Sequence, residues 1–157
     1  MPNIDEPHFD QLREEPGFRA RRAFIGRQAG AERLGASLWE VEPGQAAYPY
    51  HYHFGEEEMV VVLAGEATLR TPDGERALRA GDVVSFVRGE AGAHQLVAAG
   101  IEQLRFLAIS PSGDPDVVVY PDSGKVGAYE RRSDGGGLRE MFRRADTVDY
   151  YEGERRS

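Results

Sequence analysis

The sequence contains a small group of residues whose types and spacing suit metal binding. His51 and His53 are separated by a single residue, Glu58 follows shortly after, and His94 lies further along the chain. Side chains alternate between the two faces of a β-strand, so a His-x-His pair on a strand presents both imidazoles on the same face. Glu58 opens an apolar strand and shares a face with Val60, where a carboxylate is favoured only opposite a positive charge.

Three neutral imidazoles and one carboxylate form a donor set that suits Fe, Mn, Ni, Zn or Cu as divalent ions. We therefore predict one divalent transition metal per chain, with His51, His53, Glu58 and His94 as its ligands. Four protein ligands on an octahedral ion leave two positions for water, substrate or dioxygen. Each feature alone also has an ordinary explanation, as a polar strand face, an acidic hairpin or a turn cap, but together they favour the metal site.

Composition excludes several other classes of site and partner. A chain of 157 residues with 40% hydrophobic residues suits a single globular domain. Its net charge of −8 disfavours nucleic acid as a partner, and the absence of cysteine excludes disulfides, iron–sulfur clusters and thiolate metal sites. The acidic start of the chain lacks a signal sequence, and no apolar run could span a bilayer, so we expect a cytoplasmic protein without a membrane partner.

The elements that must position these side chains are short strands. The chain has 19 glycines and nine prolines that divide it into segments of a few residues, a rhythm typical of an antiparallel barrel or sandwich. Thr71-Pro72-Asp73-Gly74 predicts a tight hairpin between two alternating segments. The run from Met59 to Leu63 is apolar throughout, which predicts a strand covered on both faces.

The sequence also suggests where the barrel begins and ends. Residues 1–20 predict an irregular N-terminal arm, residues 21–110 the β-barrel, and residues 111–157 a C-terminal extension packing on or beside it. Within that extension, Leu138 to Arg144 could form one or two helical turns. Tyr48 alternates with the histidines, as do Tyr50 and Tyr52, so these tyrosines are expected to point away from the metal into sheet packing or a dimer contact.

The same residues resemble the two sequence motifs of the cupin superfamily. Gly44, the pair His51-x-His53, Glu58 and Gly65 match the first motif, and the interval from Glu58 to Gly65 selects Glu58 as the carboxylate, with Glu57 as a fallback.

The second motif is matched by Gly81, Gly89 and His94. Val87 stands where proline is usual and Ala98 where asparagine is usual, so the likeness departs from the pattern at turns and not at the ligand positions. The sequence resembles small single-domain bacterial cupins, with one copy of each motif.

This resemblance implies an all-β fold, the cupin double-stranded β-helix or jelly-roll barrel, with a metal inside one end and a homodimer as the default assembly. Cupins include dioxygenases, isomerases, epimerases and decarboxylases, so the fold does not select a reaction.

The leading hypothesis is a mononuclear metal-dependent enzyme, of dioxygenase or isomerase/epimerase type, acting on a small oxygen-rich or sugar-like substrate. The alternative is a non-catalytic cupin that binds or senses a small ligand and holds a structural metal. No catalytic residue can be assigned from the sequence.

Overall fold

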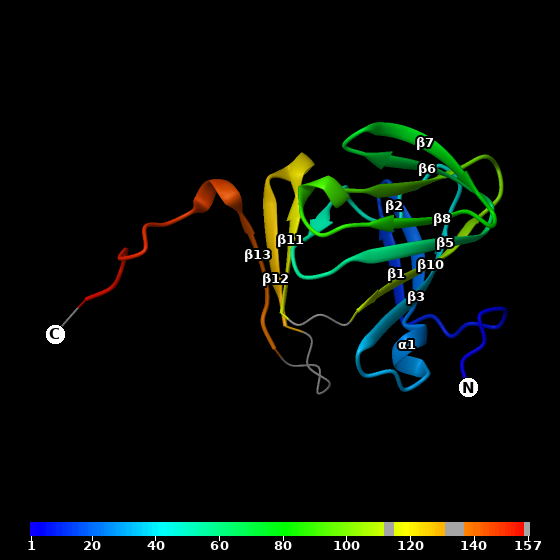
Figure 1. The fold of residues 1–157 in the computed structure, drawn as a ribbon, viewed down its shortest axis with the longest axis horizontal. Helices are drawn as coiled ribbons and strands as arrows, with labels where there is room; N and C mark the ends of the chain where they lie inside the picture. Colours follow the sequence, from blue (N-terminus) through cyan, green and yellow to red (C-terminus); the bar gives the residue numbers. More distant parts are fainter. Residues whose placement is uncertain (112–114, 131–136, 156–157) are drawn as a thin grey trace.

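A computed structural model describes residues 1–111, 115–130 and 137–155 (Figure 1). Its single α-helix in this range is one turn long, so strands are the main regular structure of the described part, and none of its helices could cross a membrane. The elements are β1 (Gln11–Glu15), β2 (Phe18–Ala23), α1 (Ile25–Gln28), β3 (Leu34–Val41), β4 (Tyr52–His53), β5 (Glu58–Ala64), β6 (Glu66–Thr71), β7 (Gly74–Arg79), β8 (Val83–Phe86), β9 (Gln95–Ala99), β10 (Leu104–Pro111), β11 (Asp116–Tyr120), β12 (Lys125–Tyr129) and β13 (Arg139–Arg143). Short 3₁₀ turns follow at η1 (Glu90–Gly92), η2 (Pro121–Ser123) and η3 (Arg144–Asp146).

The strands form three antiparallel sheets, which confirms the all-β jelly-roll barrel. A six-stranded sheet has the order β1-β2-β3-β10-β5-β8, and a three-stranded sheet has the order β7-β6-β9. Figure 1 shows these two sheets stacked over each other, with the four-stranded sheet β13-β12-β11-β4 standing at one end of the pair. The N- and C-terminal segments lie at opposite ends of the molecule in this view.

Tight turns set the strand register. The predicted hairpin is confirmed, because Thr71 pairs with Gly74 across β6 and β7 and leaves only Pro72 and Asp73 in the loop. Gly65, between β5 and β6, has a φ of 73°, and a Cβ atom there would lie 2.5 Å from the carbonyl oxygen of Gln103. Only glycine fits this turn. Strand β5, which begins at Glu58, therefore ends just before Gly65.

The hydrophobic core lies between the six-stranded and three-stranded sheets. Alternate residues of β5 point into it, and Val60 and Val62 are fully buried there. Trp39 of β3 and Phe106 of β10 stack with ring centroids 6.1 Å apart. This aromatic layer closes the barrel interior beside the histidine-bearing end.

The N-terminal segment differs from the expected irregular arm. Residues 11–15 and 18–23 form the β1–β2 hairpin, which extends the six-stranded sheet through pairing of β2 with β3. Gly17, with a φ of 84°, supplies the turn. Buried and exposed positions alternate along β2, but these positions are occupied mostly by arginine and alanine. The hydrophobic pattern of the sequence therefore did not predict the hairpin.

The C-terminal segment also differs from the expectation in one element. Residues 139–143 form strand β13 on the edge of β12 and not a helical turn, because each residue of β13 pairs with one of β12. Strand β11 pairs in turn with β4, through Val118 opposite His53 and Val119 opposite Tyr52. The chain beyond residue 110 therefore builds most of the sheet that carries His53, one of the predicted metal ligands.

Candidate metal centre

Local backbone pairing brings the predicted ligands together. His51 and His94 form an isolated bridge, in which the His51 N–H donates to the His94 carbonyl at 3.1 Å and the His94 N–H donates to the His51 carbonyl at 2.9 Å. His53 follows in β4, and Glu58 is the first residue of β5. The His51 and His53 Nε2 atoms lie 3.0 Å apart, and His94 Nε2 lies 3.3 Å from Glu58 Oε1.

Backbone carbonyls fix the tautomers of two of the rings. The Nδ1 atom of His51 lies 2.9 Å from the carbonyl oxygen of Pro49, and that of His94 lies 2.9 Å from the carbonyl oxygen of Gly92. A carbonyl oxygen can only accept, so in both rings Nδ1 carries the proton and donates it. The Nε2 atoms of His51 and His94 therefore carry no proton, and the lone pair of each faces the cluster.

Asp116 fixes the third ring in the same way. Its Oδ2 atom lies 2.6 Å from Nδ1 of His53, and its Oδ1 atom accepts the Gly55 N–H at 3.0 Å. The ionised carboxylate holds the His53 proton on Nδ1, so Nε2 of His53 also offers a lone pair. Asp116 is only 1% exposed and opens strand β11, 63 residues from His53.

With all three rings in this neutral form, the cluster holds no positive charge. Lone pairs on His51 and His53 face each other, and another on His94 faces the Glu58 carboxylate. Glu58 Oε1 and His94 Nε2 are buried and have no hydrogen-bond partner among the described residues. Acceptor atoms this close together repel one another unless a shared proton or a cation lies between them. Three imidazole nitrogens and one carboxylate are ligands that suit a divalent transition metal.

The surroundings shift the pKa values of three of the proposed ligands, His51, Glu58 and His53. Burial lowers the pKa of His51 to about 3, helped by repulsion from His94 and His53, so this ring is neutral at physiological pH. Burial opposes ionisation of Glu58, but the neighbouring His94, His51 and His53 outweigh it and lower the pKa of Glu58 to about 2. Burial also opposes protonation of His53, but Asp116 outweighs it and raises the pKa of His53.

A second group of possible ligands overlaps the first at His53. Ligand atoms of His53, Glu56 and Asp116 all lie within 4.8 Å of one another. Both Asp116 oxygens already accept hydrogen bonds, and Glu56 and Asp116 make further interactions of their own. We therefore interpret these two carboxylates as support for the Nδ1 side of His53, while its Nε2 side faces the other histidines.

Tyr48 corrects the expectation that the tyrosines point away from the cluster. Its ring meets His51 edge to face at a centroid distance of 4.9 Å and His94 at 5.6 Å. Residues 46–51 run outside any continuous strand, so the period of two does not apply to them. Tyr50 and Tyr52 do pack elsewhere, in a small cluster with Val119.

Other aromatic rings wall in the imidazoles. Phe86 lies flat on His94, with centroids 3.7 Å apart and an interplanar angle of 7°. Tyr120 of β11 stacks on His51 at 5.9 Å. His94 is 1% exposed, whereas the side chains of His53 and Glu58 are 12% and 15% exposed, so the cluster approaches solvent on the side of these two residues.

Sequence reasoning missed Asp116, although the sequence held a signal for it. Asp116 precedes the apolar run Val117-Val118-Val119, just as Glu58 precedes an apolar run in β5. A carboxylate at the start of a buried strand needs a cation or a hydrogen-bond donor beside it. This requirement holds for Asp116 as it does for Glu58. No such signal marks Tyr48, because its position depends on an irregular loop.

Comparisons with known proteins agree with this architecture. The family model described as "Cupin domain" matches residues 37–110. A provisionally assigned sugar phosphate isomerase from Acidithiobacillus ferrooxidans is 33% identical, with 85% of this chain and 82% of that chain covered and a TM-score of 0.74. No curated protein matches the sequence.

Two further solved structures share the fold. A sugar phosphate isomerase of a cupin superfamily from Silicibacter pomeroyi is 20% identical, with 97% of this chain and 98% of that chain covered and a TM-score of 0.78. The polyketide cyclase RemF from Streptomyces resistomycificus is 26% identical, with 71% of this chain and 82% of that chain covered and a TM-score of 0.55. The match to the Silicibacter protein extends over nearly the whole chain, including the segments outside residues 37–110.

Proposed function

Since this chain belongs to the cupin superfamily, we propose that its histidine cluster binds one divalent transition-metal ion and serves an enzyme acting on a small, oxygen-rich, sugar-like molecule. The proposed ligands are His51, His53, Glu58 and His94. The observation that carries the proposal is the set of three Nδ1 donors, each held by an oxygen, which leaves three Nε2 lone pairs beside Glu58. The unpartnered atoms Glu58 Oε1 and His94 Nε2 fit the same assignment.

The reaction class proposed is the isomerisation of a sugar or sugar phosphate. Support comes from the similar chain of Acidithiobacillus ferrooxidans, which carries that assignment. A divalent ion held by the four residues would act as a Lewis acid on neighbouring substrate oxygens. Burial raises the pKa of Tyr48 well above its usual value, so its hydroxyl stays protonated and can donate to a substrate oxygen. Phe86 and Tyr120 keep water from the His94 and His51 rings.

A second candidate function is binding or sensing without turnover. The tight packing around His94 favours it, as does the position of the surface hollows. One hollow of about 300 Å³ lies against β7, β8 and residues 91–93, and one of about 510 Å³ lies near Gly65 and residues 99–102. None of the four proposed ligands lines either of them.

Metal analysis combined with an exchange assay tests the enzyme proposal. The untagged protein is expected to hold one equivalent of metal after anaerobic reconstitution, and to transfer deuterium from D₂O to the carbon beside the carbonyl of an aldose or ketose phosphate. A variant with His51→Ala and His53→Ala is expected to lose both properties, and an oxygen electrode run in parallel tests for dioxygenase chemistry. Metal-loaded protein that neither exchanges hydrogen nor consumes oxygen on such substrates would favour the binding function.

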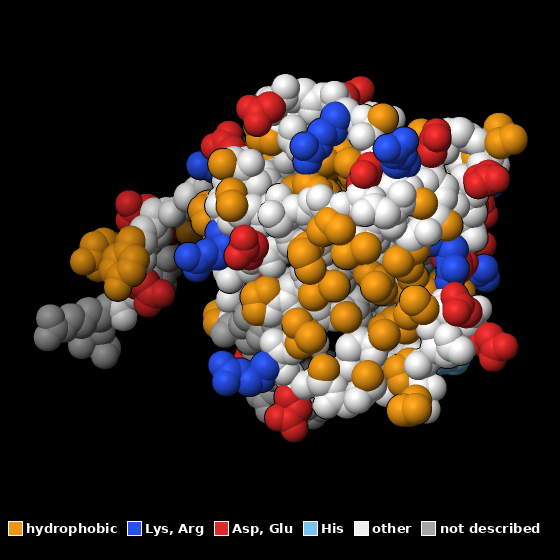
Figure 2. All heavy atoms as spheres, turned by 45° about the vertical axis from the view of Figure 1, so that its right-hand side comes forward, with side chains coloured by type: hydrophobic (Ala, Val, Ile, Leu, Met, Phe, Trp, Pro, Cys, Tyr) orange, Lys and Arg blue, Asp and Glu red, His pale blue; other side chains and the backbone are white. Residues whose placement is uncertain are grey.

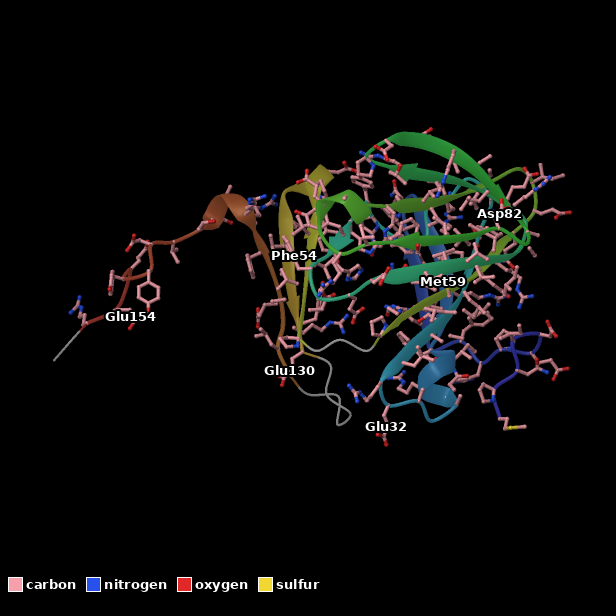
Figure 3. The ribbon with its side chains drawn as sticks, in the orientation of Figure 1. Glu32, Phe54, Met59, Asp82, Glu130 and Glu154 are labelled. Carbon is pink, nitrogen blue, oxygen red and sulfur yellow. The ribbon has the colours of Figure 1, made fainter. Side chains whose placement is uncertain are left out.

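We also propose a homodimer, formed through the outer face of the six-stranded sheet. The outer face of the apolar run of β5 is incompletely covered, contrary to the expectation from sequence, because Met59 is 37% exposed and Val61 and Leu63 are partly exposed. Cross-strand pairing aligns Ile109 with Met59, and Leu107 with Val61 and Val83. Figure 2 shows apolar side chains gathered on one face of the molecule, and Figure 3 labels Met59 on β5. Two apolar rows on an open sheet suit a second copy of the same face about a two-fold axis.

Introducing a charge into these rows is expected to separate the dimer. Val61→Lys should halve the mass measured by sedimentation velocity, because the interface would have to bury an unpaired ammonium group. Ala77→Lys, on the exposed outer side of β7, is the matched control and should leave the mass unchanged. A dimer that survives Val61→Lys would place the interface elsewhere.

A further inference from the structure

Arg13 occupies an unusual position for an arginine. It lies on β1, half-buried, with its guanidinium 4.7 Å from the centroid of the Trp39 ring. One of its nitrogens, Nη1, donates to the carbonyl oxygen of Ala47 at 3.1 Å. The indole face and this hydrogen bond fix the plane of the guanidinium, and most of its five N–H donors remain available.

The charge of Arg13 has no acidic partner among the described residues. Some other arginines do have one, such as Arg21, which pairs with Glu40 at 2.6 Å, and Arg70, which pairs with Asp122 at 2.7 Å. Those two arginines lie at the surface, whereas burial lowers the pKa of Arg13 below its ordinary value. A half-buried guanidinium that keeps its charge without a counterion is suited to receive an anion from solution.

Arg13 lies beside the histidine cluster. Its Nη1 atom donates to the carbonyl oxygen of Ala47, the residue before Tyr48, and the Trp39 ring under its guanidinium meets the Tyr48 ring edge to face at 5.6 Å. Tyr48 in turn contacts His51 at 4.9 Å between ring centroids, and Tyr120 stacks on the same imidazole at 5.9 Å. The Tyr48 hydroxyl is buried and has no hydrogen-bond partner among the described residues, which is a second and independent sign of a missing ligand.

We propose that Arg13 binds the oxyanion group, phosphate or carboxylate, of a substrate whose other end reaches the histidine cluster. This inference rests on the proposed function and adds to it that the substrate is an acid. The planar fork of the guanidinium matches two oxygens of such a group, and the Tyr48 hydroxyl can donate to the part of the molecule that lies between. Arg13 is thereby a substrate-binding residue contributed by the N-terminal hairpin.

Trp39 provides a direct readout of binding. It is the single tryptophan of the chain, and the Arg13 guanidinium lies over its ring. Titration with inorganic phosphate, glycerol phosphate or malonate, with chloride as the ionic-strength control, is expected to change Trp39 fluorescence saturably. Arg13→Met removes the charge while keeping most of the packing over Trp39, and it should weaken binding about 10- to 100-fold. Arg13→Lys should recover part of the affinity.

Arg19→Met is the matched control, because Arg19 lies on β2 with its side chain 62% exposed, near Glu42. It should bind the anion as the wild type does. The relative affinities for glycerol phosphate and malonate identify which oxyanion the site accepts. Equal affinity in wild type and Arg13→Met, or no saturable response to any of the three probes up to millimolar concentrations, would overturn the inference.

Metal content separates this inference from the proposed function. Arg13→Met should retain the full metal content of the wild type, and a loss of metal in this variant would show that Arg13 acts only by supporting the fold. Conversely, a variant with His51→Ala and His53→Ala should still respond to phosphate through Trp39. If the wild type binds no metal but shows an Arg13-dependent response, the oxyanion site stands and the metal enzyme does not.

Discussion

Glu58→Gln is expected to release the metal, whereas Glu56→Gln is expected to retain it. The Glu58 carboxylate faces His94 Nε2 at 3.3 Å, and a neutral amide there would remove the negative charge beside that nitrogen. Loss of a direct ligand should weaken metal binding by more than the roughly 10- to 100-fold typical of residues that only support ligands. Competition with a chelator of known affinity measures the difference.

Glu56 makes the comparison sharp, because it lies two residues from Glu58, is buried, and has a carboxylate oxygen within 4.8 Å of a ring nitrogen of His53. Circular dichroism of both variants serves as the control for folding. The opposite outcome, with metal lost in Glu56→Gln and kept in Glu58→Gln, would move the site to His53, Glu56 and Asp116. Loss in neither variant would contradict both assignments.

Asp116→Asn is expected to weaken metal binding about 10- to 100-fold while leaving every direct ligand in place. Asparagine removes the charge that holds the His53 proton on Nδ1, and its NH2 group replaces one of the two oxygens that accept from His53 and Gly55, so one of these donors faces another donor. The His53 ring is then free to turn and to present the wrong tautomer. Metal titration followed by a chelator gives the affinity, and thermal melting reports the accompanying loss of stability.

Asp122→Asn is the control for this prediction. Asp122 follows β11 closely in sequence and also forms a charged pair, with Arg70, but this pair lies at the surface. Exposed ion pairs contribute little to stability, so the control should keep both metal affinity and melting temperature. Unchanged metal affinity in Asp116→Asn would show that the Asp116–His53 hydrogen bond does not position the ring for binding.

Much of the fold could be predicted from the sequence, because the signals for it are local. The hairpin at Pro72-Asp73 is encoded in the residues that form it, and the inward row of Val60 and Val62 follows from the period of two. The close approach of His51 and His94 was expected from the motif pattern, and the reciprocal backbone pairing now explains it.

The features that escaped prediction depend on contacts between distant segments. Asp116 reaches His53 only because β11 pairs with β4, a strand of two residues whose partner no local pattern specifies. Tyr48 faces the cluster because its segment is irregular, so the alternation rule gave the wrong side. Arg13 lies on a hairpin of charged residues that has little hydrophobic periodicity.

The pairing of β11 with β4 has a consequence for the order in which the protein matures. All four proposed ligands lie within residues 51–94, yet the residue that orients His53 lies in β11, which begins at Asp116. Proteins are synthesised from the N-terminus, so a nascent chain displays its histidines before it has the strand that aligns them. On the proposed ligand assignment, tight metal binding would therefore require β11 to have been synthesised and to have paired with β4.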